Sequence, residues 1–414
     1  MGGEGWEIMQ RGSKVLFGVG GGIAAFKAVE AARLLMERGA EVRVVMSAAA
    51  TRFITPFSLE NLTNHSVFSD LWGESPEGET HIRLAGWADA LVIAPATMEL
   101  IGKLALGLPN DALSATAAAC PAPLVLAPAM NTVMYEHAAT TANLATLRER
   151  GAVVVGPTYG RLANGAQGLG RMAEPEDIAA AVAMTLGQRG DLAGRRVLVT
   201  AGPTQEPLDP VRYIGNRSSG KMGYALAIAA RDRGAVVTLV SGPVALRPPY
   251  GVTVVGVTTA EEMRAAVHAY VVGADALIMA AAVADYRPLT TAEHKIKKEQ
   301  ATLTVDLART TDILGSLVEI AGAPRVKVGF AAETRGVVDE GTRKLKKKGL
   351  DLVVANDVAG GAVFGADTNH VHLIDRDGNT EELGPAPKER IAEGILDAVA
   401  ELLREREQSV GDGQ

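Results

Sequence analysis

The sequence contains almost no cysteine. Cys120 is the one cysteine in 414 residues, so an intrachain disulfide and a cysteine-rich metal centre are both excluded. Long apolar runs are missing too, because Glu99 and Lys103 interrupt the longest candidate before it reaches the ~18 residues that a bilayer span needs. The first residues are polar and acidic, unlike a secretory leader. We therefore expect a cytoplasmic protein without a membrane anchor.

A strong charge of one sign is also absent. The chain has 41 basic and 48 acidic side chains and a net charge of -7, so we expect no general attraction to nucleic acid or to an anionic membrane. Aromatic residues make up only 4%, whereas hydrophobic residues make up 47% and glycines number 46. This composition is typical of layered α/β packing. The length exceeds what one core usually serves, so we expect two domains.

The hydrophobic pattern indicates two α/β units. A strand, a glycine turn, a helix and a second strand follow one another over residues 14–46, and the same pattern starts again over 195–242. Further buried strands are expected at 89–95, 123–129 and 152–157 in the first half, and at 274–282, 326–333, 351–357 and 370–375 in the second. The polar stretch 187–196 is the expected linker. The sequence thus predicts two doubly wound domains, residues 1–189 and 190–414.

The glycine turn GVGGGIAA, residues 18–25, is typical of a phosphate site at a helix N-terminus. It lacks an acid placed for an NAD ribose, because Glu41 precedes the second strand. A nicotinamide-dependent oxidoreductase therefore remains a less favoured alternative. Thr97 and Asn131 follow later strands and are expected to face the same crevice. His81 is expected in the first turn of a short helix, where a lone histidine more often lies at the surface.

Two basic clusters stand out in the acidic second half. They are HKIKK at 294–298 and RKLKKK at 343–348. A solvated helix face explains most such runs. However, Ser218 and Ser219 precede a helix in the same half, and hydroxyls with free N–H groups suit phosphate. Together these features favour a polyphosphate ligand.

Longer motifs carry a family resemblance over nearly the whole chain. The first half resembles the flavin-dependent phosphopantothenoylcysteine decarboxylases through GGGIAAFKA, FITPFS, HIRL, APAT with IGKLALG, APAMNTVM and GRLANGAQGLGRMAEP. The second half resembles phosphopantothenate–cysteine ligase through AGPTQEPLDPVRYIGNRSSGKMG, AAVADYRP, KIKK, VGFAAET and ANDV. The resemblance implies a bifunctional enzyme of coenzyme A biosynthesis. Its domains would be Rossmann-like, a flavodoxin-like decarboxylase at 1–189 and a nucleotide-binding ligase at 190–414.

For the first domain the resemblance implies FMN, whose role is to create an electron sink. Oxidation of the cysteinyl CH2–SH to a thioaldehyde gives a C=S group that accepts the electrons left when CO2 departs. His81 and Asn131 would be catalytic, and Met134 and Arg171 would hold substrate. The implied FMN contacts are Gly20, Gly21, Gly22, Ile23, Ala24, Ser47, Pro95, Ala96 and Thr97.

The resemblance also implies that residues 160–175 form a mobile flap over the substrate. This chain has Asn164 where many relatives have the cysteine that supplies the last proton, and an amide is a poor proton donor. The proton source is therefore open, and a flavoprotein binding or assembly module without turnover is an alternative. Gly21 replaces a common serine, and Met98 and Glu99 replace a small residue and an asparagine.

For the second domain the resemblance implies CTP, which activates the 4'-phosphopantothenate carboxylate as an acyl-cytidylate that cysteine then attacks. Asn216 would serve formation of the acyl-cytidylate, and Lys295 its conversion. Mg²⁺ would come with the nucleotide and not in a permanent protein cage. The implied CTP contacts are Met279, Ala280, Ala281, Asp285, Lys295, Thr311, Asp312, Ile313, Leu314, Phe330, Lys344 and Lys348. The family further implies a homo-oligomer, with trimers of the flavin half that assemble into dodecamers and dimers of the ligase half.

Overall fold

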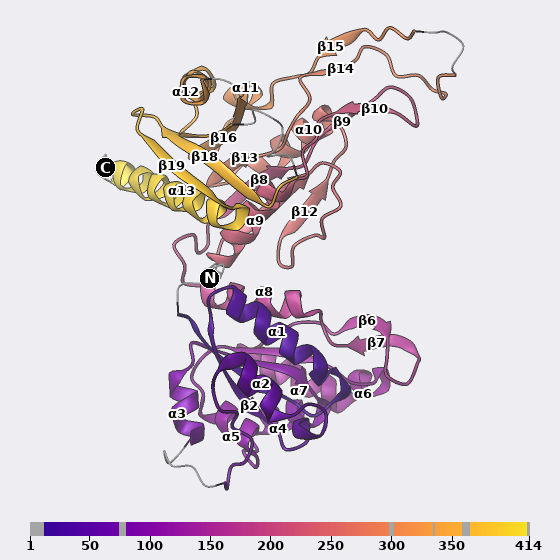
Figure 1. Cartoon of the computed structure of the whole chain (residues 1–414), viewed down its shortest axis with the longest axis vertical. Coiled ribbons are helices and arrows are strands. Elements are labelled where there is room, and N and C mark those ends of the chain that lie inside the picture. Colours follow the sequence, from indigo (N-terminus) through magenta and orange to yellow (C-terminus); the bar gives the residue numbers. More distant parts are fainter. Residues whose placement is uncertain (1–11, 74–79, 298–301, 334–335, 358–364, 412–414) are drawn as a thin grey trace. The chain divides into compact units, whose positions relative to one another are not determined.

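The computed structural model describes residues 12–73, 80–297, 302–333, 336–357 and 365–411. The chain forms two compact units, Met1–Gly187 and Gln188–Gln414 (Figure 1). Each unit has its own sheet and its own core, and each is described below by itself.

Unit 1 is built on a five-stranded parallel sheet with strand order β2-β1-β3-β4-β5. Its strands are β1 (Lys14–Val19), β2 (Glu41–Met46), β3 (Ala90–Ala96), β4 (Leu124–Pro128) and β5 (Val153–Val154). This is the flavodoxin-like order, in which the chain reverses direction across the sheet beside β1. The predicted strands are all present, with β5 reduced to 2 residues. The predicted α/β class is confirmed.

Helices cover both faces of this sheet. They are η1 (Ile23–Ala25), α1 (Phe26–Glu37), η2 (Ala50–Arg52), α2 (Pro56–Thr63), α3 (Thr80–Trp87), α4 (Met98–Leu106), α5 (Ala112–Ala119), α6 (Thr132–Glu136), α7 (Ala138–Glu149) and α8 (Pro175–Gly187). Side chains from α3, α4, α5 and α7 pack with those of β1, β3 and β4 in one buried cluster, while α1 packs against α8. Burial of these apolar faces holds the strand ends in fixed positions.

The glycine-rich stretch predicted as a flap forms a β-hairpin. Its strands β6 (Thr158–Arg161) and β7 (Gln167–Arg171) pair antiparallel. Periodicity did not predict these strands, because glycine has low strand propensity and the strands are short.

Unit 2 has an eight-stranded sheet with strand order β12-β11-β8-β13-β16-β17-β18-β19. The bounds are β8 (Arg196–Ala201), β11 (Val236–Ser241), β12 (Thr253–Gly256), β13 (Ala276–Met279), β16 (Val326–Glu333), β17 (Leu352–Asp357), β18 (Thr368–Asp375) and β19 (Thr380–Pro387). The last two strands run antiparallel at one edge. The sequence did not predict β12 or β19.

The unit 2 helices also lie in two layers. They are α9 (Lys221–Asp232), α10 (Ala260–Val271), α11 (Ile313–Ser316), η3 (Leu317–Glu319), α12 (Val337–Lys348) and α13 (Lys388–Gly411). α9 and α13 pack on each other and share one buried cluster with the sheet, whereas α10 and α12 bury their apolar sides in separate clusters. Among the described residues, no helix is long and apolar enough to cross a membrane.

A long arm extends from unit 2 between the short paired strands β14 (Tyr286–Pro288) and β15 (Leu307–Arg309) (Figure 1). The outgoing half of the arm is held by a loop that joins the paired strands β9 (Gln205–Pro207) and β10 (Tyr213–Gly215). Asp209 in that loop accepts a hydrogen bond from the Ile296 N–H at 3.1 Å, and the Arg212 guanidinium donates to the Ile296 carbonyl at 2.8 Å. The arm therefore begins as an ordered extension of the unit.

Candidate functional site

Unit 1 contains a cavity of about 920 Å³ at the carboxyl ends of its parallel strands. Its wall comes from the turn after β1, the start of α4 after β3, the loop after β4 and the β6–β7 hairpin. The lining residues are Gly21, Gly22, Ile23, Ala24, Phe26, Lys27, Thr97, Met98, Glu99, Ala129, Met130, Asn131, Met134, Arg161, Leu162, Ala163, Asn164, Gly170, Arg171 and Met172. Ligands bind at this edge of open α/β sheets.

The glycine turn has the geometry that an anion requires. A Cβ on Gly20 would lie 2.2 Å from the Pro95 carbonyl oxygen, so only glycine fits there. The Gly20 N–H donates to that oxygen, at 3.2 Å, and the Ala25 N–H donates to the Gly22 carbonyl. The intervening N–H groups, from Gly21 to Ala24, have no acceptor among the described residues. Free N–H groups that open a helix form a phosphate site.

The structure explains the glycine at position 21. A Cβ on Gly21 would lie 2.3 Å from the Cβ of Ala49 and 2.8 Å from its carbonyl carbon. A serine here would therefore collide with the segment that follows β2. At this position the turn can therefore offer an anion only its backbone N–H group.

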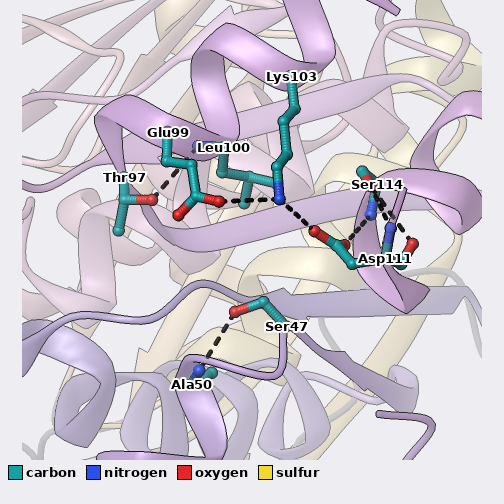
Figure 2. A network of polar contacts seen from close by, with 8 residues as sticks. All are labelled: Ser47, Ala50, Thr97, Glu99, Leu100, Lys103, Asp111 and Ser114. Carbon is teal, nitrogen blue, oxygen red and sulfur yellow. Dashed lines mark hydrogen bonds and ion pairs between the residues drawn. The ribbon is translucent and has the colours of Figure 1, made fainter. Parts of the chain in front are cut away.

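Two polar side chains that were predicted to contact FMN, Thr97 and Ser47, make local hydrogen bonds, as Figure 2 shows. Thr97 caps α4 by accepting from the Leu100 N–H at 3.4 Å. Ser47 accepts from the Ala50 N–H at 3.2 Å and does not line the cavity. Its contact with FMN stays a prediction.

Glu99 belongs to an ion-pair network on α4. The Lys103 ammonium lies 2.9 Å from Glu99 and 2.7 Å from Asp111 (Figure 2). Asp111 also accepts from the Ser114 N–H and caps α5. Although burial would raise the pKa of Asp111, Lys103 and Ser114 outweigh it and hold that pKa below its usual value. The carboxylate that replaces a more usual asparagine is thus anchored at the cavity rim.

The hairpin glycines are required by close packing. A Cβ on Gly168 would lie 2.2 Å from the Thr132 hydroxyl, and a Cβ on Gly170 would lie 2.2 Å from the Met130 carbonyl oxygen. The Met130 N–H donates to the Gly170 carbonyl at 3.0 Å. The base of the hairpin is therefore fixed against the loop that carries Asn131, whose side chain caps α6 by accepting from the Val133 N–H.

The tip of the hairpin holds Asn164. Its side-chain oxygen accepts from the Ala166 N–H at 3.1 Å, which stabilises the turn. Cys120 does not replace the missing thiol, because it does not line the cavity and its sulfur instead donates to the Ala85 carbonyl. Burial raises the pKa of the Cys120 thiol, which makes it less reactive.

Sequence reasoning missed two cations in the cavity wall, Lys27 and Arg161. Lys27 lies 2.8 Å from Glu174, which also lies 2.7 Å from Arg171. A lysine on an amphipathic helix and an arginine in a glycine-rich loop are usually solvated, so neither pattern gave a signal. His81 lies on α3 outside the lining, and Gly20, Pro95 and Ala96 support the wall from behind it.

Unit 2 has a cavity of about 630 Å³ at the carboxyl ends of β13 and β16. Its lining residues are Met279, Ala281, Val283, Ala284, Asp285, Tyr286, Arg309, Thr310, Thr311, Asp312, Ile313, Leu314, Phe330, Lys344, Lys347 and Lys348. Of the predicted nucleotide contacts, Ala280 and Lys295 are outside this wall. Ala280 packs against the unit 2 core, and Lys295 is exposed on the arm.

Two lysines of the basic cluster on α12 have different partners. Lys344 donates to the Phe330 carbonyl at 2.5 Å, and burial lowers the pKa of its ammonium. Lys348 pairs with Asp312. Although burial would raise the pKa of Asp312, the contact with Lys348 lowers it. The cluster at 294–298 lies on the arm outside the cavity lining, and its last residue is outside the described part. Its contribution to a polyphosphate site stays a prediction.

Asn216 lies beside this cavity. Its amide donates to the Ala282 carbonyl at 2.5 Å, and its side-chain oxygen accepts from the Ser218 N–H. Gly220 follows with a φ of 76° and caps the N-terminus of α9. The helix entrance predicted for a phosphate is thus formed. Within the described residues, no group of three or more His, Cys, Asp or Glu could hold a metal ion.

Comparison with known proteins gives the same division. The Flavoprotein family model matches residues 7–187, and the model of the DNA/pantothenate metabolism flavoprotein C-terminal domain matches residues 192–403. The coenzyme A biosynthesis bifunctional protein CoaBC of Haemophilus influenzae is 44% identical over 94% of this chain and 98% of its own. The protein of that name from Bacillus subtilis is 43% identical over 96% of this chain and 99% of its own. The one from Escherichia coli K12 is 45% identical over 94% of this chain and 97% of its own. The chain belongs to the family of CoaBC bifunctional proteins of coenzyme A biosynthesis.

Proposed function

We propose that residues 1–189 bind FMN and decarboxylate 4'-phosphopantothenoylcysteine, and that residues 190–414 make this compound from 4'-phosphopantothenate and cysteine with CTP. One observation carries the assignment. Each unit has its own cavity at the carboxyl ends of its parallel strands, and residues implied by the decarboxylase or ligase resemblance line that cavity. A protein with two such cavities can run two successive reactions.

The unit 1 cavity fits FMN at the glycine turn. The N–H groups from Gly21 to Ala24 are free to bind the phosphate, and the glycine at position 20 lets the turn approach β3 closely. FMN supplies two-electron redox chemistry at the substrate thiol. Asn131 holds the substrate carboxylate, while Met134 and Arg171 line the remaining path. Because the Asn164 amide holds its protons at neutral pH, water or another acid supplies the last proton.

We propose that a second copy of the chain completes this site. His81 belongs to α3 and is not among the residues that line the cavity, so it would act on a flavin bound in a neighbouring copy. Large apolar side chains remain exposed on unit 1, including Phe57 at 71% and Val133 at 75%. Such surfaces favour association. The trimer, and a dodecamer built from trimers, would bury them.

The unit 2 cavity fits a nucleotide triphosphate. Lys344, Lys347 and Lys348 line one wall and supply positive charge for the phosphates. Asp285 and Asp312 line the same cavity, so a Mg²⁺ ion would arrive with the nucleotide and rest partly on its phosphate oxygens. Lys295 lies on the arm and would act in the cavity of a dimer partner. These features suit CTP-dependent activation in the cytoplasm.

Product analysis tests the proposal directly. The full chain is incubated with 4'-phosphopantothenate, cysteine, Mg²⁺ and CTP, and products are identified by mass. We expect 4'-phosphopantetheine. Asn131→Ala should accumulate 4'-phosphopantothenoylcysteine, and Asn216→Asp should stop both products. If no amide product forms, the ligase assignment fails. If the amide forms and no CO2 is lost, unit 1 is a flavoprotein module without turnover.

Two further measurements test the cofactor and the shared site. A flavin absorption spectrum of the purified protein is expected, and a nicotinamide instead of a flavin would support an oxidoreductase. Mixing His81→Ala with Asn131→Ala, each inactive alone, should restore part of the decarboxylation, because hybrid sites then contain both wild-type groups. No recovery after subunit exchange would refute the shared site.

A further inference from the structure

One cationic side chain in the wall of the unit 1 cavity makes no ion pair with the described residues. Lys27 and Arg171 both pair with Glu174, at 2.8 and 2.7 Å. Glu99 is paired with Lys103. The remaining charged side chain of the wall is Arg161, whose guanidinium has no ion pair or hydrogen bond among the described residues.

Each strand of the hairpin contributes one arginine to the cavity wall, Arg161 from β6 and Arg171 from β7. Arg161 is the last residue of β6 and pairs with Gln167, just before the turn. Arg171 lies in the other strand, and its side chain packs over Gly160, because a Cβ on Gly160 would lie 3.0 Å from the Arg171 Cδ. Both arginines line the cavity, and Arg161 is the one without an ion pair among the described residues.

We infer that Arg161 binds the phosphate group of the decarboxylase substrate, an inference that rests on the proposed function. The substrate has a carboxylate at its reacting end, assigned to Asn131, and a phosphomonoester at its other end. The N–H groups from Gly21 to Ala24 lie on the α1 wall and serve the flavin phosphate. The hairpin guanidinium is therefore left for the second phosphate, which arginine binds through two parallel hydrogen bonds.

This role makes Arg161 a specificity-determining residue. It selects phosphorylated over unphosphorylated acyl-cysteines, because a guanidinium left unpaired in the closed cavity gains nothing from an alcohol end. It also couples the hairpin to the substrate, because the same strand pair carries Asn164 at its tip and Gly170 at its base. A phosphorylated substrate would draw the hairpin over the cavity.

The test compares two substrates in the FMN-loaded full chain. Decarboxylation of 4'-phosphopantothenoylcysteine and of pantothenoylcysteine is measured for wild type, Arg161→Gln, Arg161→Lys and the control Arg148→Gln, an exposed arginine on α7. Arg161→Gln should lower kcat/KM for the phosphorylated substrate about 10- to 100-fold, mainly through KM. It should leave the unphosphorylated substrate unchanged, Arg161→Lys should recover part of the loss, and Arg148→Gln should behave as wild type.

Other outcomes overturn the inference. If Arg161→Gln lowers kcat/KM equally for both substrates, Arg161 serves the carboxylate or the hairpin structure. If it lowers kcat/KM for neither, Arg161 does not contact the substrate. If wild type decarboxylates neither substrate, the decarboxylase proposal fails separately. The dissociation constants of both compounds, from changes in the flavin spectrum, then decide the Arg161 question, since Arg161→Gln must weaken only the phosphorylated one.

Discussion

Replacement of Gly20 by alanine should disable unit 1, whereas the same change at Gly22, two residues later in the same turn, should not. A Cβ at position 20 would lie 2.2 Å from the Pro95 carbonyl oxygen, but a Cβ at position 22 meets only the Thr97 methyl at 3.6 Å. Gly22 has a φ of -166°, which any residue adopts. Both variants add one methyl group, and only the methyl at position 20 would collide with a neighbouring atom.

The cost follows from this geometry. An ordinary carbon contact is about 3.5 Å, so β1 and β3 must separate by more than an ångström at Gly20 and break its hydrogen bond to Pro95. Overpacking costs about 1–3 kcal/mol and the bond about 1 kcal/mol, so we expect a loss of about 3 kcal/mol. For a unit of this size that lowers Tm by roughly 6–12 °C. Gly22→Ala should be neutral or slightly stabilising.

The assay uses the full chain, in which unit 2 provides an internal control. Bound flavin is quantified by absorbance, and thermal unfolding of unit 1 is followed by flavin release. Gly20→Ala should lose flavin and stability while its CTP-dependent ligation stays intact, and Gly22→Ala should keep all three. If Gly20→Ala retained its flavin and unfolded within about 2 °C of wild type, or if both variants failed alike, the close approach to Pro95 would not be what requires glycine.

The other predictions concern charge and proton supply. Burial raises the pKa of Glu393 from 4.5 to about 7, although the neighbouring Arg233 lowers it. Folded unit 2 therefore binds an extra proton between these pH values, and its unfolding free energy falls by up to about 3 kcal/mol as pH rises. Glu393→Gln should remove this dependence in denaturant titrations at pH 5 and 8, and an unchanged dependence would contradict the assignment. Burial lowers the pKa of Lys344, so KM for CTP should rise as alkaline pH removes its charge. Lys344→Arg should flatten that rise, because arginine keeps its charge. If KM rises with pH equally in wild type and in Lys344→Arg, Lys344 is not the titrating group. Asn164→Cys should raise the ratio of 4'-phosphopantetheine to its ene-thiol precursor in mass analysis, and an equal ratio would show that the thiol is not limiting.

The sequence predicted the parallel strands and the loops that follow them because buried strands give continuous apolar runs and their ends share one edge of a sheet. It did not predict β19, whose sequence includes Gly384 and Pro385. These residues disfavour a central strand, but an edge strand tolerates them because one side needs no partner. Arg161 was missed for a different reason. Its role depends on which cations of the cavity wall already have an ion-pair partner, and the sequence does not show those pairs.

The glycines of the 160–175 stretch have a structural role that composition alone did not reveal. Their density suggested a mobile cover, which glycine allows through its conformational freedom. In the fold, Gly168 and Gly170 are instead required where the hairpin base meets the loop around Asn131, because a Cβ at either position would lie 2.2 Å from an oxygen. Gly165, with a φ of 84°, serves the tip turn. Arg161 and Asn164 line the cavity at the turn end of the same hairpin, so close packing of its glycines against the loop around Asn131 helps to place both side chains at the ligand site.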